Sequence, residues 1–261
     1  MNPSIAGVTS GWLHPALFVT GFCAGWVDSI AGGGGIITIP VLLNVGLPPS
    51  LALGTNKLQA AFGSGSAAWH YGRAGLIDWT PCRSGVGWTF VGAVLGTLLV
   101  GQLDPVLLRF LIPCLLVGIA LYILLRPPVG AIERPARMAP APFFFCAGLG
   151  LGFYDGFFGP GTGSFWVVAL AWGLGFDLLR ATAHTKMMNF TSNVGSLAVF
   201  AGLGQINWAA GVVMGAGQWL GAWLGSRVVI RRGAHFIRPV FVAVALAMTG
   251  RLLWLNLRDW F

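Results

Sequence analysis

The chain has few charged residues. Only 8% of its 261 residues are Asp, Glu, Lys or Arg, whereas roughly 25% of an average soluble domain is charged. Hydrophobic residues make up 56%, and apolar runs close to the bilayer-spanning length of about 20 residues recur along the chain. This composition excludes an ordinary soluble domain. It predicts an all-α polytopic membrane protein whose helices pack against one another and against lipid.

Lysine is the scarcest charged residue. The chain has two lysines, Lys57 and Lys186, which lie 129 positions apart, each within a long apolar stretch. An ammonium group is costly to bury near the middle of a bilayer unless it meets a cavity or a counter-charge. The pair therefore indicates a site.

Cysteine is also sparse, and its spacing excludes the usual metal and redox motifs. The four cysteines are isolated, with no CxxC pair: Cys23, Cys82, Cys114 and Cys146. We expect no disulfide, no metal site and no cofactor. Residues 1–15 contain no Lys or Arg, so we expect no cleaved signal peptide.

The net charge of +8 does not predict a nucleic-acid partner. The arginines gather in the expected loops 72–83, 126–142 and 227–236, as the positive-inside rule requires of cytoplasmic loops. The repeat mates of two of these loops, 201–207 and 102–105, carry no Lys or Arg. Equivalent loops would thus lie on opposite sides of the membrane, which predicts an inverted-topology repeat of the kind many secondary transporters use.

The comparison of equivalent loops rests on an internal repeat in the sequence. The lysine spacing of 129 recurs in the pairs Gly75/Gly204, Trp79/Trp208, Gly92/Gly221 and Arg109/Arg238. Near two glycine-rich stretches the spacing is 127, as in Gly25/Gly152 and Asp28/Asp155. A self-match of this length predicts two structurally equivalent halves.

The halves are a first repeat over 1–126, a cytoplasmic linker over 127–142 and a second repeat over 143–261. The expected helices of the first repeat are 13–31, 35–47, 51–71, 84–101 and 106–125. Those of the second are 143–158, 162–176, 179–203, 208–226 and 237–257. The second helix of each half is short for a bilayer crossing, so we expect 8 to 10 membrane-embedded helices, with glycine-broken segments.

Each half contains a glycine-rich break that follows an aspartate: Asp28–Pro40 and Asp155–Ser164. Glycine runs favour unwinding, and an unwound segment inside a membrane must be buried in protein or face a wet cavity. The next helix then offers unpaired N–H groups to an anion, which predicts substrate contacts at Gly33, Gly34 and Gly161. The alternative is that the glycines only allow close helix packing.

Polar side chains accompany each lysine. Asn56 and Gln59 flank Lys57, and Asn189 and Asn193 follow Lys186, so amide donors for an oxyanion lie beside each ammonium group. The lysines could instead pair with Asp28 and Asp155, which would hold the lysines or the broken helices or take up a coupling proton. A further alternative is that each lysine extends along its aliphatic stem to the membrane interface.

Two other features of the sequence do not indicate a binding or catalytic site. The GxxxG motifs Gly92–Gly96 and Gly221–Gly225 are explained by helix packing. Ser64 and His70 lie six apart, on nearly opposite faces of one helix, and make a poor catalytic dyad. We therefore expect no enzyme.

At four motifs the chain resembles the TauE/SafE (sulfite exporter) family, in its YfcA-like branch: Gly21–Pro40, Gly54–Gln59, Gly152–Gly163 and His184–Asn193. The resemblance extends over about residues 15–255. It implies a multi-pass protein of the bacterial inner membrane that moves small sulfur-containing anions such as sulfite, sulfonates or related organosulfur acids.

Together these features predict a secondary transporter of a small anion that works by alternating access. The expected partners are the anion and the lipid bilayer, with a homo-oligomer left open. Two alternatives remain at this point: a channel-like anion pore, and a membrane scaffold or assembly factor without flux of its own.

Overall fold

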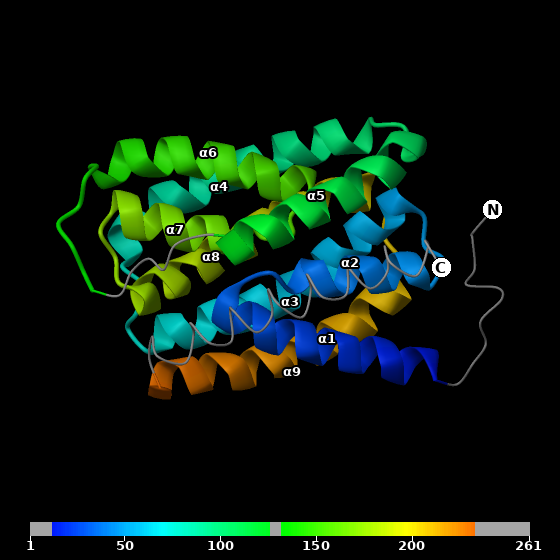
Figure 1. Cartoon of the computed structure of the whole chain (residues 1–261), viewed down its shortest axis with the longest axis horizontal. Helices are drawn as coiled ribbons and strands as arrows, with labels where there is room; N and C mark the ends of the chain where they lie inside the picture. The colour runs from blue at the N-terminus through cyan, green and yellow to red at the C-terminus, as the bar shows by residue number, and fades with distance from the viewer. Residues whose placement is uncertain (1–11, 126–131, 233–261) are drawn as a thin grey trace.

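The computed structural model describes residues 12–125 and 132–232, and within these ranges every regular element is an α-helix. Figure 1 shows the helices as an elongated assembly in which most run along the long axis. The first-repeat helices are α1 (Leu13–Ala31), α2 (Gly34–Asn44), α3 (Pro49–Arg73), α4 (Trp79–Gly101) and α5 (Pro105–Leu125). The second-repeat helices are α6 (Pro140–Phe157), α7 (Thr162–Gly173), α8 (Leu178–Gly202) and α9 (Trp208–Arg232). The all-helical prediction is confirmed.

Two helix bounds differ from the prediction in an informative way. α4 begins at Trp79 rather than 84, because Pro81 falls in the first turn, where a missing N–H costs little. α9 continues to Arg232, so much of the expected basic loop 227–236 is helical. Arg231 and Arg232 lie in the last turn, where positive charge complements the helix dipole. The expected helix 237–257 lies outside the described residues.

The short second helices are present in both halves. α2 has 11 residues and α7 has 12, which at 1.5 Å per residue gives about 17 to 18 Å, little more than half of a hydrocarbon core of about 30 Å. Each begins directly after a glycine break. Gly33 (φ 109°) and Gly161 (φ 81°) occupy the left-handed region at the two N-caps, a conformation that glycine adopts without strain.

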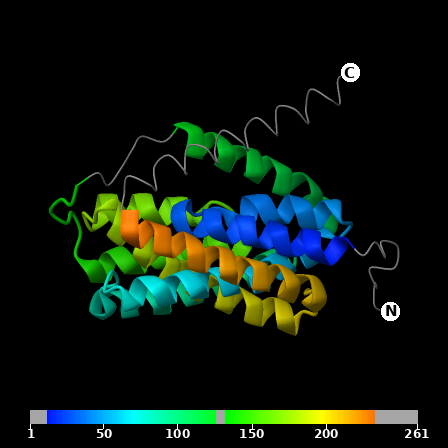
Figure 2. The same cartoon turned by 90° about the horizontal axis from the view of Figure 1, so that it is seen from below.

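The two repeats exchange helices. α1 packs along α9, and α6 packs along α4, so the first helix of each repeat lies against the fourth helix of the other. This produces a first bundle of α1, α2, α3 and α9 and a second bundle of α4, α6, α7 and α8, which occupy the lower and upper parts of Figure 1. α5 contacts α3 and lies on the outside of the assembly (Figure 2).

Glycines make the exchanged contacts possible. A Cβ on Gly96 of α4 would clash with the backbone oxygen of Phe153 on α6, and a Cβ on Gly221 of α9 would clash with that of Phe22 on α1. Small residues allow this close approach of two helix backbones. The packing interpretation of both GxxxG motifs is confirmed.

The lysine-bearing helices α3 and α8 form the main contact between the two bundles. They run antiparallel, because Gly54, near the start of α3, lies against Phe200, near the end of α8, while Gly65 lies against Phe190. An inverted repeat requires that equivalent helices of the two halves run in opposite directions, as α3 and α8 do. Which side of a membrane each loop faces stays a prediction.

Candidate functional site

Both lysines lie in the interior of the protein. Lys57 on α3 is 1% exposed and Lys186 on α8 is 0% exposed. Neither side chain reaches an outer surface, so the alternative in which each lysine extends to the membrane interface is wrong. The ammonium groups must find partners within the protein, since an isolated buried charge costs several kcal/mol or more.

Each lysine pairs with the aspartate of the other repeat. Lys57 Nζ lies 2.8 Å from Asp155 Oδ1 and also donates to the Asp155 backbone oxygen. Lys186 Nζ lies 3.2 Å from Asp28 Oδ2. Both ion pairs join the first bundle to the second. The carboxylates that the sequence offered as one of two partners are therefore the partners in this conformation.

The two aspartates are held differently. Asp28 Oδ1 accepts hydrogen bonds from the backbone N–H groups of Gly33 (3.0 Å) and Gly34 (3.2 Å), at the start of α2. Asp155 Oδ2 instead accepts a hydrogen bond from the Ser192 hydroxyl on α8. Asp28 thus occupies a helix N-terminus, the kind of position the sequence assigned to a substrate anion.

The two glycine breaks meet between the bundles. A Cβ on Gly32 would lie 3.0 Å from the Cα of Gly163 in the first turn of α7. A side chain at Gly32 would force this backbone contact to shift, and the φ of 74° at Gly32 also favours glycine. The N-terminal ends of both half-helices therefore converge on one region.

A small cavity of about 30 Å³ lies in this region. Residues from both bundles line it: Asp28, Gly33, Gly34, Gly35, Asn56, Ala60, Asp155, Gly159, Gly163, Asn189, Asn193 and Gln218. Seven residues predicted for the site are among them, namely Asp28, Gly33, Gly34, Asn56, Asp155, Asn189 and Asn193. A volume of this size holds very few water molecules, so the cavity is closed to a larger ligand in this conformation.

Four predicted residues do not line the cavity. Lys57 and Lys186 are not part of the lining, but each bonds to an aspartate that is. Gln59 Nε2 donates to Asn56 Oδ1 at 2.8 Å, so it holds another site residue in place. Gly161 packs against Ile119, where an added Cβ would clash with the isoleucine side chain.

The sequence reasoning missed Gln218 on α9. Its side chain lines the cavity, and its Oε1 atom, like Oδ1 of Asn189, is buried without a hydrogen-bond partner. A signal was available, because Gln218 is the single amide in the apolar segment 208–226. Polar residues within such segments usually face a helix interface or a cavity.

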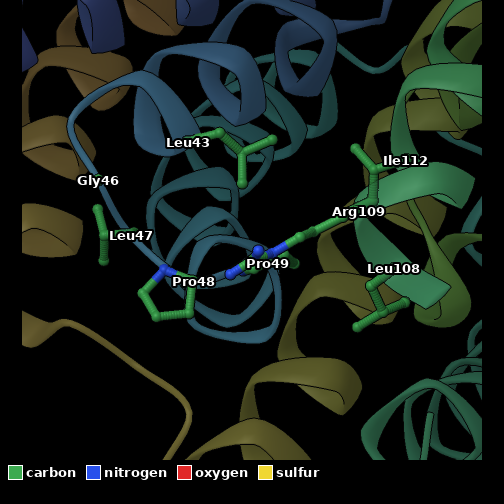
Figure 3. A pocket seen from close by; sticks show the side chains of 8 residues that line it. All are labelled: Leu43, Gly46, Leu47, Pro48, Pro49, Leu108, Arg109 and Ile112. Carbon is green, nitrogen blue, oxygen red and sulfur yellow. The ribbon is translucent and has the colours of Figure 1, made fainter. Parts of the chain in front are cut away.

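A second hollow, of about 400 Å³, lies between the α2–α3 turn and α5 (Figure 3). Its lining is Leu43, Gly46, Leu47, Pro48, Pro49, Leu108, Arg109 and Ile112. The Arg109 side chain extends from α5 toward Pro49 and is exposed. This lining has one charged group and no buried polar cluster, so the smaller central cavity is the better candidate for a specific site.

By length and composition alone, α4 is the one helix among the described residues that is apolar and long enough to cross a membrane. Comparison with known proteins is more informative. The family model "Sulfite exporter TauE/SafE" matches residues 17–252. The chain belongs to the TauE/SafE family of membrane transporters.

Curated relatives agree with this assignment. The chain is 47% identical over 237 residues to "Probable membrane transporter protein ORF9" of Sinorhizobium sp, covering 91% of each chain. It is 46% identical over 247 residues to "Probable membrane transporter protein YfcA" of Escherichia coli K12, covering 95% of this chain and 92% of the relative. A "Probable membrane transporter protein" of Haemophilus influenzae is 45% identical over 238 residues, which is 91% of this chain and 93% of that protein. No solved structure matches the chain.

Proposed function

We propose that this TauE/SafE member is a secondary transporter of a small sulfur-containing anion, such as sulfite or a sulfonate, in the bacterial inner membrane. The observation that carries the proposal is the pair of buried Lys–Asp bridges beside a small polar cavity between two helix bundles. Ionisable groups buried within transmembrane helices mark substrate and ion pathways. The family description supplies the sulfur chemistry.

The residues around the cavity suit a small oxyanion. Lys57 and Lys186 supply positive charge, and the side-chain amides of Asn56, Asn189 and Asn193 can donate hydrogen bonds. The converging N-terminal ends of α2 and α7 add backbone N–H groups and two positive dipole ends. An anion therefore finds donors on both sides of the cavity.

Alternating access then comes from movement of one bundle against the other. A movement of the first repeat against the second would have to separate α1 from α9 and α4 from α6, where glycines bring the backbones into direct contact. The α3–α8 contact between the bundles instead holds the cavity and is crossed by both ion pairs. Opening at this contact exposes the cavity to one side at a time.

The test is uptake of radiolabelled sulfite and methanesulfonate into proteoliposomes. We expect Lys57→Ala and Lys186→Ala to abolish uptake while the protein still inserts, and Arg109→Ala, outside the central cavity, to retain it. Normal uptake by the double lysine variant would reject the proposal. Uptake without saturation or counterflow would indicate a channel, and a wild-type protein that moves none of the anions but co-purifies with a partner would indicate a scaffold.

A further inference from the structure

We propose that the Asp28 carboxylate occupies the position of the substrate's oxyanion group, and that the substrate takes this position when Asp28 accepts a proton. The inference rests on the proposed function and extends it to the coupling ion. It makes the protein a proton–anion symporter whose substrates carry an oxyanion group with at least two oxygens.

The contacts of Asp28 are those of a bound anion. One carboxylate oxygen accepts two neighbouring backbone N–H groups, from Gly33 and Gly34, and the other faces the Lys186 ammonium group. A sulfonate, sulfite or carboxylate head presents oxygens that can satisfy the same three donors, because charge-assisted bonds from ammonium and helix N-terminal groups are not specific to one oxyanion.

The size of the cavity also requires the substrate to replace the Asp28 carboxylate. The cavity of about 30 Å³ has room for very few water molecules, which is too small for a sulfonate beside the Asp28 carboxylate. Rotation of the Asp28 side chain away from α2 would add the space of the carboxylate to that of the cavity and free the three donors. The substrate and the carboxylate therefore compete for one position.

Charge explains why the exchange needs a proton. The groups that face Asp28 are Lys186 from α8, Asp155 across the cavity from α6, and Tyr71 from α3, whose hydroxyl donates to the Ser29 carbonyl. Lys57 is bound to Asp155, so the two lysines and two aspartates together are neutral. A substrate anion next to an ionised Asp28 meets a like charge at short range, and protonation of Asp28 removes that repulsion.

Two side-chain amides in the cavity have oxygens without a hydrogen-bond partner. The terminal oxygens of Asn189 and Gln218 are buried without hydrogen-bond partners, and both residues line the cavity. Asn189 is 7% exposed and Gln218 is 1% exposed. Buried polar atoms are normally satisfied, so these oxygens are free to accept a hydrogen bond from a group that carries a proton, such as a protonated Asp28 carboxyl, whereas only the N–H groups of the same amides can donate to an oxyanion.

Asp155 does not have the same role, although it is the repeat mate of Asp28. Its two carboxylate oxygens are bound by Lys57 and by Ser192, and it does not accept from the α7 N-terminus. The exchange position is therefore specific to Asp28. In each cycle Asp28 takes a proton from the side where the anion binds, and both leave on the other side, so a monoanion crosses without net charge.

Methanesulfonate is the probe for the test, because it stays a monoanion across neutral pH and brings no proton of its own. With wild-type protein in liposomes that contain a pH dye, we expect uptake to acidify the lumen by one proton per anion, and to respond to a pH gradient and not to an imposed potential. Uptake that follows the potential and leaves the luminal pH unchanged would overturn the inference. Absence of flux for both methanesulfonate and sulfite would instead reject the proposed function.

Binding of methanesulfonate to detergent-purified protein compares the wild type with two matched variants. For the wild type, the Kd for methanesulfonate should rise up to about tenfold per pH unit across neutral pH, as obligatory uptake of one proton requires. Asp28→Asn mimics the protonated acid, so its Kd should be independent of pH and about tenfold or more lower at the alkaline end. Asp155→Asn makes the same change of charge and should retain the pH dependence. The inference fails if Asp28→Asn titrates like the wild type or if both variants lose the dependence equally.

Discussion

Asn193 Nδ2 donates a hydrogen bond to Ser64 Oγ at 3.2 Å, and the two residues lie 129 positions apart in the chain. That spacing also separates the two lysines, so Ser64 and Asn193 are repeat mates. Equivalent positions of two related halves can touch only where the axis that relates them passes. The predicted inverted repeat therefore places its axis between α3 and α8, beside the central cavity that Asn193 lines.

This contact can be tested by exchange of its partners. Asn193→Ala should lower the free energy of unfolding by about 1 kcal/mol, the typical net value of a buried hydrogen bond. The double variant Ser64→Asn with Asn193→Ser places the same groups on opposite helices and should recover most of that loss. Thermal unfolding in detergent measures both. An exchanged variant no more stable than Asn193→Ala would show that the axis does not relate these positions.

The buried ion pairs should show strong coupling. Lys57→Met leaves Asp155 unpaired in the interior and should cost about 3–5 kcal/mol, whereas Lys57→Met with Asp155→Leu should regain most of the stability, because the buried charge is gone. Transport should be lost in both variants.

Arg180 provides the comparison for the Lys57 variants. It binds Asp78 and Glu133 while 31% exposed, and exposed pairs contribute about 0–1 kcal/mol. Arg180→Met should therefore cost far less than Lys57→Met. Equal losses in chemical denaturation would contradict the burial argument.

The exchanged helix contacts depend on glycine. Gly96→Ala forces a methyl group against the backbone of Phe153 and Phe157, and overpacking of this kind typically costs about 1–3 kcal/mol. Gly87 lies on the same helix, and a Cβ there would meet nothing within 4 Å. Gly87→Ala should leave the melting temperature unchanged or raise it, since alanine favours helix. Similar destabilisation by both variants would mean that the effect is not one of packing.

Thiol cross-links distinguish the moving units. In a cysteine-free background, a cross-link between Gly65→Cys on α3 and Phe190→Cys on α8 joins the two bundles and should stop transport. A cross-link between Thr89→Cys on α4 and Met188→Cys on α8 lies within the second bundle, where Thr89 Oγ1 contacts Met188 Sδ at 3.4 Å, and should leave transport intact. Reversal by reductant is the control for each. Transport that survives the α3–α8 cross-link would exclude movement between the bundles.

The sequence predicted well those features that are determined locally. Apolar runs interrupted by glycine and proline located the helices within a few residues, including the short α2 and α7. The glycine breaks after Asp28 and Asp155 located the starts of α2 and α7, whereas the division into two halves from the spacing of Lys57 and Lys186 stays a prediction. Each of these signals lies in the residues that form the element.

The features that depend on tertiary contacts could not be predicted in this way. The residues of α4 and α9 do not indicate that each of these helices packs on the first helix of the other repeat. A GxxxG motif predicts close packing but does not identify the partner helix. The sequence left Lys57 with either a carboxylate or a substrate as partner, and only the fold brings Asp155 to it. Gln218 was not predicted as a site residue, because the GxxxG motif on its helix is explained by helix packing alone.

The exchange of fourth helices also governs how the protein can be made. α1 leaves the ribosome first, but the surface it fits belongs to α9, which is synthesised only after most of the chain. Until α9 is made, the glycines of α1 that contact it lack that partner, and until α6 is made those of α4 lack theirs. Each half taken alone lacks the main contact of its first and fourth helices, so we expect either half expressed by itself to be less stable than the whole chain.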